Sequence, residues 1–241
     1  IEIIKKIFVS TEDGKIAAVA EEFGADIIPR PHDLAQDDSP EWLAWQHAIK
    51  WLGERGDNFD IFISLPTTSP LRNKNDITQC LAFLDEKTDV VVGITEAARS
   101  PYFNMVRKDS NDFIDVIMKN DNHYARRQET PAVYDMTTVA YVSRPEFIRN
   151  ATGMFNGKVK GVNIPSERAL DIDTELDFEI AEFLMNKILN YNKVKENAKS
   201  IECINSTISV ICENRMSSLL TFLSSLKRVK TGLIELTHAL N

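Results

Sequence analysis

Two hydrophobic periods alternate along the first part of this chain. Short apolar runs of the kind that buried strands need are separated by stretches whose apolar residues recur at helical spacing. We therefore predict strands at residues 6–10, 25–29, 61–65 and 89–94, and helices at 11–23, 40–55 and 75–85. Strands that alternate with helices are typical of a mostly parallel α/β sheet, in which ligands bind at the carboxyl ends of the strands.

The pattern changes after this region. Residues 102–117 alternate as in a hairpin or meander, and we predict further strands at 136–143 and 159–164 and helices at 144–150 and 174–190. A polar stretch follows residue 190, and residues 202–241 again carry apolar residues at helical spacing. We therefore expect one α/β domain over residues 1–190 and a helical extension over 191–241.

Composition narrows the function classes. The chain has 241 residues and a net charge of −8, which argues against binding nucleic acid through a basic surface. Its three cysteines are far apart and lack C-x-x-C spacing, so we expect reduced thiols in the cytoplasm and neither a zinc site nor a disulfide framework. No stretch has the length of a membrane span.

The most informative segment is Ala169–Asp177, with the sequence ALDIDTELD. In an extended segment, residues two apart point to the same side, so Asp171 and Asp173 can bind one Mg²⁺ together with substrate phosphates. The alternative is a helix cap, in which Asp173 or Thr174 accepts hydrogen bonds from the first turn of the following helix.

Three further segments carry candidate binding groups. The loop 65–72 contains two prolines, hydroxyl groups that include Ser69, and the planar guanidinium of Arg72, which suits a carboxylate or phosphate. The segment from Arg30 to Asp38 places an arginine before an acidic loop, where it can meet a nucleotide base. Arg127 and Gln128 lie in a cluster suited to an acidic ligand. Each segment can instead be a solvated surface loop.

Taken in this order, these four segments resemble the acylneuraminate cytidylyltransferases, which activate nine-carbon acidic sugars. The resemblance covers residues 1–190, and its most specific parts are TSPLR at 68–72 and DIDTELD at 171–177. Ser100–Val106 and Tyr134–Thr138 resemble the bacterial members tied to legionaminic-type sugars.

The resemblance implies a Rossmann-like nucleotidyltransferase fold with three α/β/α layers, a mostly parallel sheet and a small dimerisation subdomain at about residues 100–160. It implies a cytoplasmic homodimer that transfers CMP from CTP to the sugar and releases pyrophosphate, without nucleic-acid or membrane partners. The implied site residues are Asp171 and Asp173 for catalysis and for Mg²⁺ or Mn²⁺, Arg30, Asp37 and Ser69 for the nucleotide, and Arg72, Arg127, Gln128 and Tyr141 for the sugar.

Three departures from the family pattern stand out. Pro66-Thr67 replaces a Gln-Pro pair whose glutamine touches the sugar, and Thr137-Thr138 replaces an Asn-Gly pair. The opening strand and its Gly/Arg/Ser/Lys loop, which holds the CTP phosphates, are absent before Ile1, so the chain is expected to be an incomplete copy with open sheet edges and low stability. The alternatives are a non-catalytic binding or dimerisation module and a cytidylyltransferase for the eight-carbon acid Kdo.

Overall fold

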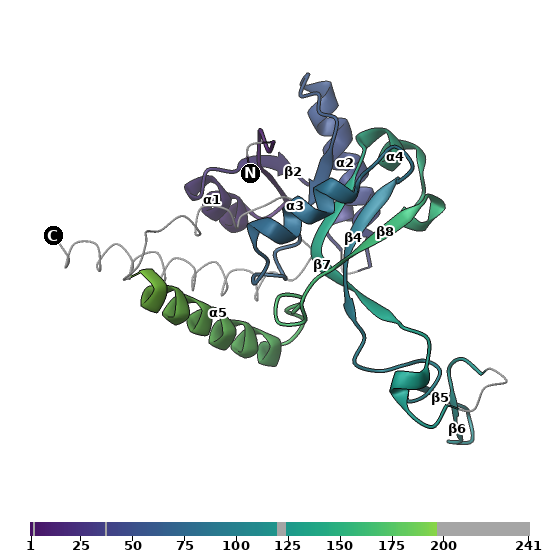
Figure 1. The fold of residues 1–241 in the computed structure, drawn as a ribbon. Coiled ribbons are helices and arrows are strands. Elements are labelled where there is room, and N and C mark those ends of the chain that lie inside the picture. The colour runs from purple at the N-terminus through teal and green to yellow at the C-terminus, as the bar shows by residue number, and fades with distance from the viewer. Residues whose placement is uncertain (2, 37, 120–123, 197–241) are drawn as a thin grey trace.

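The computed structural model describes residues 1, 3–36, 38–119 and 124–196 (Figure 1). Asp37 and residues 197–241, which include most of the expected helical extension, lie outside the described residues. The elements in chain order are β1 (Phe8–Thr11), α1 (Gly14–Glu22), β2 (Asp26–Pro29), η1 (His32–Leu34), α2 (Glu41–Glu54), β3 (Phe62–Ser64), α3 (Lys74–Phe83), β4 (Val90–Glu96), β5 (Val106–Lys108), β6 (Ile114–Val116), η2 (Arg127–Glu129), β7 (Tyr134–Ser143), α4 (Pro145–Asn150), η3 (Met154–Asn156), β8 (Val159–Asn163) and α5 (Glu175–Glu196).

The main sheet has the strand order β3-β7-β4-β8. β8 pairs in parallel with β4, whereas β7 pairs antiparallel with both β3 and β4. Because β3 and β4 both run against β7, they point the same way as β8. The prediction of a mostly parallel α/β sheet is therefore confirmed, with β7 as the one reversed strand that the described residues contribute to the main sheet.

A second, two-stranded sheet is formed by β1 and β2, which pair in parallel. Within the described part of the chain no backbone ladder joins β1 to β3, so each of these strands has an open edge. Helix α2 nevertheless joins the two sheets through one buried cluster, in which Trp45 and Ile49 pack with Ile28 of β2 and Phe62 of β3. The two sheets therefore share one hydrophobic core.

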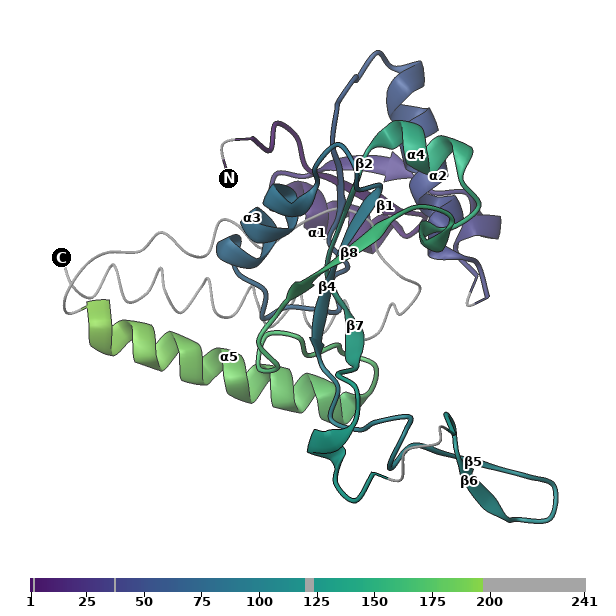
Figure 2. The ribbon, with the colours of Figure 1, turned by 45° about the vertical axis from the view of Figure 1, so that its right-hand side comes forward.

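Helices cover both faces of the main sheet (Figure 2). Side chains alternate between the two faces of a strand, so Val90 and Val92 of β4 pack with α2 and α4, whereas Val91 packs on the opposite side with Ile77 and Cys80 of α3. This arrangement confirms the expected three layers.

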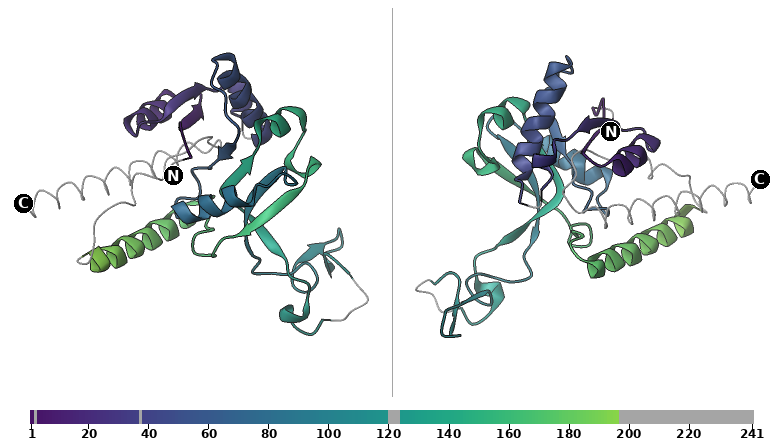
Figure 3. Two further views of the ribbon diagram at one scale, coloured as in Figure 1. Left: turned by 45° about the horizontal axis from the view of Figure 1, so that its top comes forward. Right: turned by 180° about the vertical axis from the view of Figure 1, so that it is seen from behind.

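An arm leaves the body after β4 and returns with β7. It carries the antiparallel hairpin of β5 and β6, and it projects from the end of the sheet opposite to α2 (Figure 3). The expected subdomain at 100–160 is larger than this arm, because β7, α4 and β8 belong to the main body. Residues 97–133 are the arm from here on.

Helix α5 starts close to the predicted position and ends later than expected. It continues to Glu196, so residues 191–196, predicted as part of a polar linker, are helical. At its start, Phe178 and Ala181 pack on Ile172 and Leu170 of the preceding segment. No helix in the described ranges combines the length and apolar character needed to cross a membrane.

Candidate active site

A bulge in β7 shapes the centre of the candidate site. β7 pairs with β4 through Val92 and Tyr141, and the next pair along is Gly93 with Thr137, which leaves residues 138–140 without partners on β4. The bulge brings Thr138 to the loop after β3, where its Oγ1 lies 2.6 Å from Oγ of Ser69. Gly93 permits the close approach, since a Cβ atom there would lie 2.5 Å from Oγ1 of Thr137.

The segment that carries Asp171 is hydrogen-bonded to the same loop on both sides of this residue. Oγ of Ser69 donates to the carbonyl of Leu170 at 3.3 Å, and the amide of Ile172 donates to the carbonyl of Thr68 at 2.9 Å. Ser69 is fully buried. The structure therefore uses the Ser69 hydroxyl to join the loop, β7 and the Asp171 segment, whereas its predicted contact with a nucleotide remains a prediction.

Arg72 lies buried next to this junction. Its Nη2 donates to the carbonyls of Pro66 and Thr138, and its Nε is buried without a partner in the described part of the chain. Burial lowers the pKa of Arg72 to about 9, while Asp171 and Asp76 act in the opposite direction. The guanidinium is thus still charged at neutral pH and supplies a fixed positive charge near Asp171.

Thr174 and Asp177 form the cap of α5. Oδ2 of Asp177 accepts from the amide and the hydroxyl of Thr174, at 2.8 and 2.7 Å, and Oγ1 of Thr174 accepts from the amide of Asp177 at 3.3 Å. This reciprocal pair is a capping box. The hydrogen bond to Thr174 also holds the pKa of Asp177 below its usual value. The cap interpretation therefore belongs to Thr174 and Asp177.

The two remaining carboxylates fit a magnesium site. Oδ1 of Asp171 is buried and has no hydrogen-bond partner among the described residues, which is costly for a carboxylate oxygen unless a cation meets it. Asp173 is exposed on the same segment. Within the described residues no group of three or more His, Cys, Asp or Glu side chains could hold a metal ion. Two carboxylates suit Mg²⁺, which keeps several waters and binds substrate phosphates.

Arg30 lies at the carboxyl ends of the smaller sheet. Its Nη2 donates to the carbonyl of Ser10 at 2.7 Å and its Nε to Oγ of Ser10 at 3.2 Å. The side chain is largely buried. It therefore ties the end of β2 to β1 on the edge where a parallel sheet binds ligands. Asp37, which was also predicted to bind the nucleotide, lies outside the described residues.

The predicted sugar ligands lie in two different places. Arg127 is on the arm, where its Nη1 donates to the carbonyl of Ala97 at 2.7 Å and its Nη2 lies 3.6 Å from Glu96. Gln128 is exposed next to it. Tyr141, in contrast, is buried in the core between β7 and α2. Arg127 and Gln128 thus lie on the arm and Tyr141 lies on β7, and their contacts with the sugar remain predictions.

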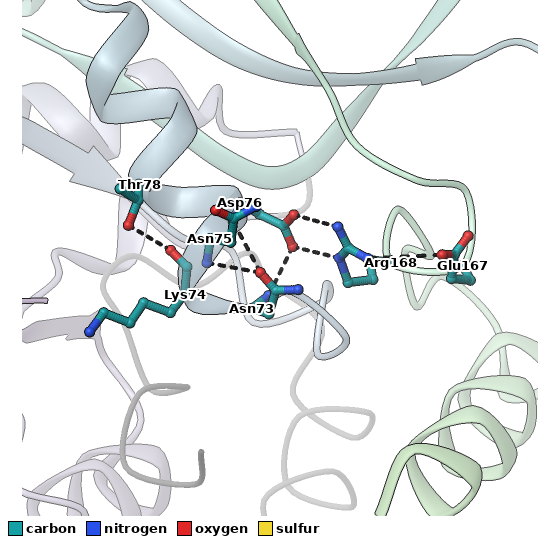
Figure 4. A network of polar contacts seen from close by, with 7 residues as sticks. All are labelled: Asn73, Lys74, Asn75, Asp76, Thr78, Glu167 and Arg168. Atoms are coloured by element: carbon teal, nitrogen blue, oxygen red, sulfur yellow. Dashed lines mark hydrogen bonds and ion pairs between the residues drawn. The ribbon is translucent and has the colours of Figure 1, made fainter. Parts of the chain in front are cut away.

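Sequence reasoning did not predict the ion pair between Asp76 and Arg168 (Figure 4). Asp76 is almost fully buried at the start of α3 and forms a two-pronged ion pair with Arg168, with Nε to Oδ2 at 2.9 Å and Nη2 to Oδ1 at 2.8 Å. The pattern Asn73-x-x-Asp76 could have predicted the observed capping box of α3. No local signal pairs residues that are 92 positions apart.

Comparisons with known proteins now identify the family. No family model matches the chain. The chain is 30% identical over 190 residues to post-translational flagellin modification protein B of Campylobacter coli, with 77% of this chain and 79% of that protein covered. It is 31% identical over 189 residues to CMP-N,N'-diacetyllegionaminic acid synthase of Campylobacter jejuni, with the same coverage. It is also 23% identical to the N-acylneuraminate cytidylyltransferase of Escherichia coli, over 77% of this chain and 43% of that enzyme.

Solved structures show the same fold at lower identity. The structure of CMP:2-keto-3-deoxy-manno-octonic acid synthetase complexed with CTP matches with a TM-score of 0.54 at 14% identity, covering 77% of this chain and 82% of that one. The 4-diphosphocytidyl-2C-methyl-D-erythritol synthase of Anaerococcus prevotii matches with a TM-score of 0.52 at 14% identity, covering 76% and 82%. These likenesses confirm the Rossmann-like nucleotidyltransferase fold. Because two relatives are 30% and 31% identical over most of both chains, the protein belongs to the acylneuraminate cytidylyltransferase family.

Proposed function

We propose that this protein transfers CMP from CTP to a nonulosonic acid of the sialic or legionaminic type and releases pyrophosphate. The observation that carries the proposal is the buried Oδ1 of Asp171, which has no hydrogen-bond partner in the described part of the chain. It lies on a segment that two hydrogen bonds hold against the loop after β3. The curated relatives, named for CMP-activated nine-carbon acids, support this substrate class.

Asp171 and Asp173 would hold Mg²⁺ or Mn²⁺. When bound, the metal would neutralise charge on the phosphates of CTP. The chain's own contribution is rigid placement. Ser69 fixes the backbone beside Asp171, and the buried guanidinium of Arg72 supplies a fixed positive charge next to it. Both features are present before the substrates bind. The site therefore needs no reorganisation when charge develops in the transition state.

The reaction forms one bond and breaks one bond. The anomeric hydroxyl oxygen of the sugar attacks the α-phosphorus of CTP, and the bond from that phosphorus to the oxygen that bridges the α- and β-phosphates breaks. Pyrophosphate leaves with that oxygen, and the hydroxyl proton passes to a base or to solvent. Arg30 is proposed to contact the nucleotide, because it lies at the carboxyl ends of β1 and β2.

A second copy of the chain would complete the sugar site. The arm and the adjoining part of β7 expose many large apolar side chains, which a monomer would leave in water. They are Phe103, Met105, Val106, Phe113, Ile114, Ile117, Met118, Tyr134 and Met136. We propose that this surface forms a homodimer and that Arg127 and Gln128 reach the partner's site and bind the sugar carboxylate.

The acidic composition and the free, buried Cys80 support a cytoplasmic location.

The test is pyrophosphate release by the full chain with CTP, Mg²⁺ and a panel of nine-carbon and eight-carbon acids. We expect turnover with nine-carbon acids, and we expect Asp173→Asn to abolish it. Glu175→Gln is the matched control, since it removes the same charge two residues away and should keep activity.

Three other outcomes would redirect the proposal. Turnover with only an eight-carbon acid would assign a Kdo-type enzyme. A folded dimer that does not bind CTP would favour a non-catalytic binding module. Full activity of Asp173→Asn would remove the metal assignment while leaving the substrate assignment in place.

A further inference from the structure

The ion pair between Arg168 and Asp76 joins the segment that carries Asp171 and Asp173 to α3, which covers the opposite face of the sheet from α2. Both guanidinium contacts are short, 2.9 and 2.8 Å, and they engage both carboxylate oxygens of Asp76. The Asp76 side chain is 2% exposed and that of Arg168 is 23% exposed. A two-pronged pair of this kind fixes the direction of the guanidinium as well as its distance.

Asp76 is a rigid anchor. Its Oδ2 also accepts from the amide of Asn73 at 2.9 Å, and the side chain of Asn73 accepts in return from the amide of Asp76 at 3.1 Å. This capping box closes the first turn of α3, which packs on the sheet through Ile77 and Cys80. The carboxylate therefore has little freedom to follow Arg168 if Arg168 moves.

Arg168 in turn lies three positions before Asp171, within a compact turn. Its amide donates to the carbonyl of Pro165 at 2.9 Å, and the amide of Ala169 lies within 3.2 Å of the carbonyls of Pro165 and Ser166. The next fixed points are Leu170 and Ile172, which bond to the loop after β3. The backbone of Asp171 is thus held from the α3 side by Arg168 and from the loop side by its own neighbours.

We propose that Arg168 is a positioning residue, which through Asp76 sets the direction in which Asp171 and Asp173 present their oxygens to the metal. The inference rests on the proposed function for its consequence in turnover, but its physical claim concerns the chain alone. Without the ion pair, the loop contacts would still attach the segment, whereas the turn that precedes Asp171 would lose its anchor on α3.

The first measurement is hydrogen exchange by the full chain without metal or nucleotide. In Arg168→Ala, amides in residues 168–174 should exchange faster than in the wild type, while peptides from α2 should not change. Lys160→Ala is the matched control, because it breaks an exposed ion pair, at 2.6 Å, between β8 and Asp85 in the loop after α3. Equal exchange at 168–174 in the wild type and Arg168→Ala would overturn the inference.

The second measurement is the Mg²⁺ concentration that gives half-maximal pyrophosphate release. Loss of a residue that orients a ligand typically weakens metal affinity by about 10–100-fold, so Arg168→Ala should raise this concentration by about that factor. Arg168→Lys keeps the charge but makes only one of the two contacts. Its half-maximal Mg²⁺ concentration should lie between those of the wild type and Arg168→Ala. A lower melting temperature with an unchanged Mg²⁺ midpoint would mean that the pair is only structural.

Because Asp76 is left as a buried unpaired charge in Arg168→Ala, the double variant Asp76→Asn/Arg168→Gln serves as a second test. It removes both charges and should still raise the Mg²⁺ midpoint. If the wild type shows no CTP-dependent turnover, the proposed function fails, and hydrogen exchange alone still decides whether Arg168 anchors the segment.

Discussion

The ring of Tyr141 lies 5.3 Å from the indole of Trp45, centroid to centroid, in the core between β7 and α2. Trp45 also packs on Phe62 of β3 at 5.7 Å. Tyr141 is 7% exposed, so its ring contributes to the contact between helix and sheet. The ring therefore has a role in the core, and the predicted contact of Tyr141 with the sugar stays a prediction.

Substitution of Tyr141 separates these two roles. Tyr141→Ala should lower the free energy of unfolding by about 3 kcal/mol or more, since it empties part of a packed aromatic core. Tyr141→Phe keeps the ring and should leave KM for the sugar unchanged. The measurements are chemical denaturation and initial rates at varied sugar concentration. A raised KM for the sugar in the stable Tyr141→Phe variant would restore the pocket assignment.

The cap of α5 and the metal site should respond to different substitutions. Thr174→Ala removes the hydroxyl of the capping box and should cost about 1 kcal/mol of stability, with no change in the Mg²⁺ midpoint of turnover. Asp173→Asn should show the opposite, with lost metal-dependent turnover and little change in melting temperature. Equal effects of both variants on both quantities would mean that cap and metal site cannot be separated.

The arm is expected to hold the dimer together. Phe113→Asp places a charge on an apolar side chain that is 74% exposed, and it should convert the protein to monomers in light scattering coupled to size exclusion. Phe155→Asp, at a body position that is 72% exposed, is the matched control and should leave the dimer intact. A dimer that survives Phe113→Asp would place the interface elsewhere.

Mixing two inactive variants tests whether the arm serves the partner's site. Arg127→Ala and Asp173→Asn should each be inactive alone. If Arg127 acts on the partner's site, each mixed dimer contains one site with both residues intact, so unfolding and refolding the two together should recover about a quarter of wild-type turnover. No recovery, with mixed dimers shown to form, would place Arg127 at the site of its own chain.

His47 gives a pH dependence to stability. Its Nδ1 is buried without a partner among the described residues, and burial, followed by the charges of Arg30 and Lys50, lowers the pKa of His47 below the usual 6.5. The unfolded chain therefore takes up this proton first as pH falls through 6.5, so stability is full above 6.5 and declines below it. His47→Gln should reduce the fall in melting temperature between about pH 7.5 and 5.5. An equal fall in both proteins would contradict this assignment.

The sequence by itself determined most of the elements and the capping box at the start of α5. Hydrophobic periods report which face of a strand or helix is buried, so β1, β2, β3, β4 and the helices between them were predicted close to their observed bounds. The spacing of Asp171 and Asp173 likewise follows from the strand period, and the pattern from Thr174 to Asp177 is the capping box that the structure contains.

Only the tertiary structure decided how these pieces act together. The reversed strand β7, its bulge at Thr138, the burial of Ser69 and Arg72, and the pairing of Asp76 with Arg168 all join residues that are far apart along the chain. A local sequence pattern reports contacts between residues that are close along the chain. The partner of a buried charge, and the position of a bulge in a strand, depend instead on which elements pack together in the folded protein. For the same reason, the assignment of the cap of α5 to Thr174 and Asp177 required the observed hydrogen bonds.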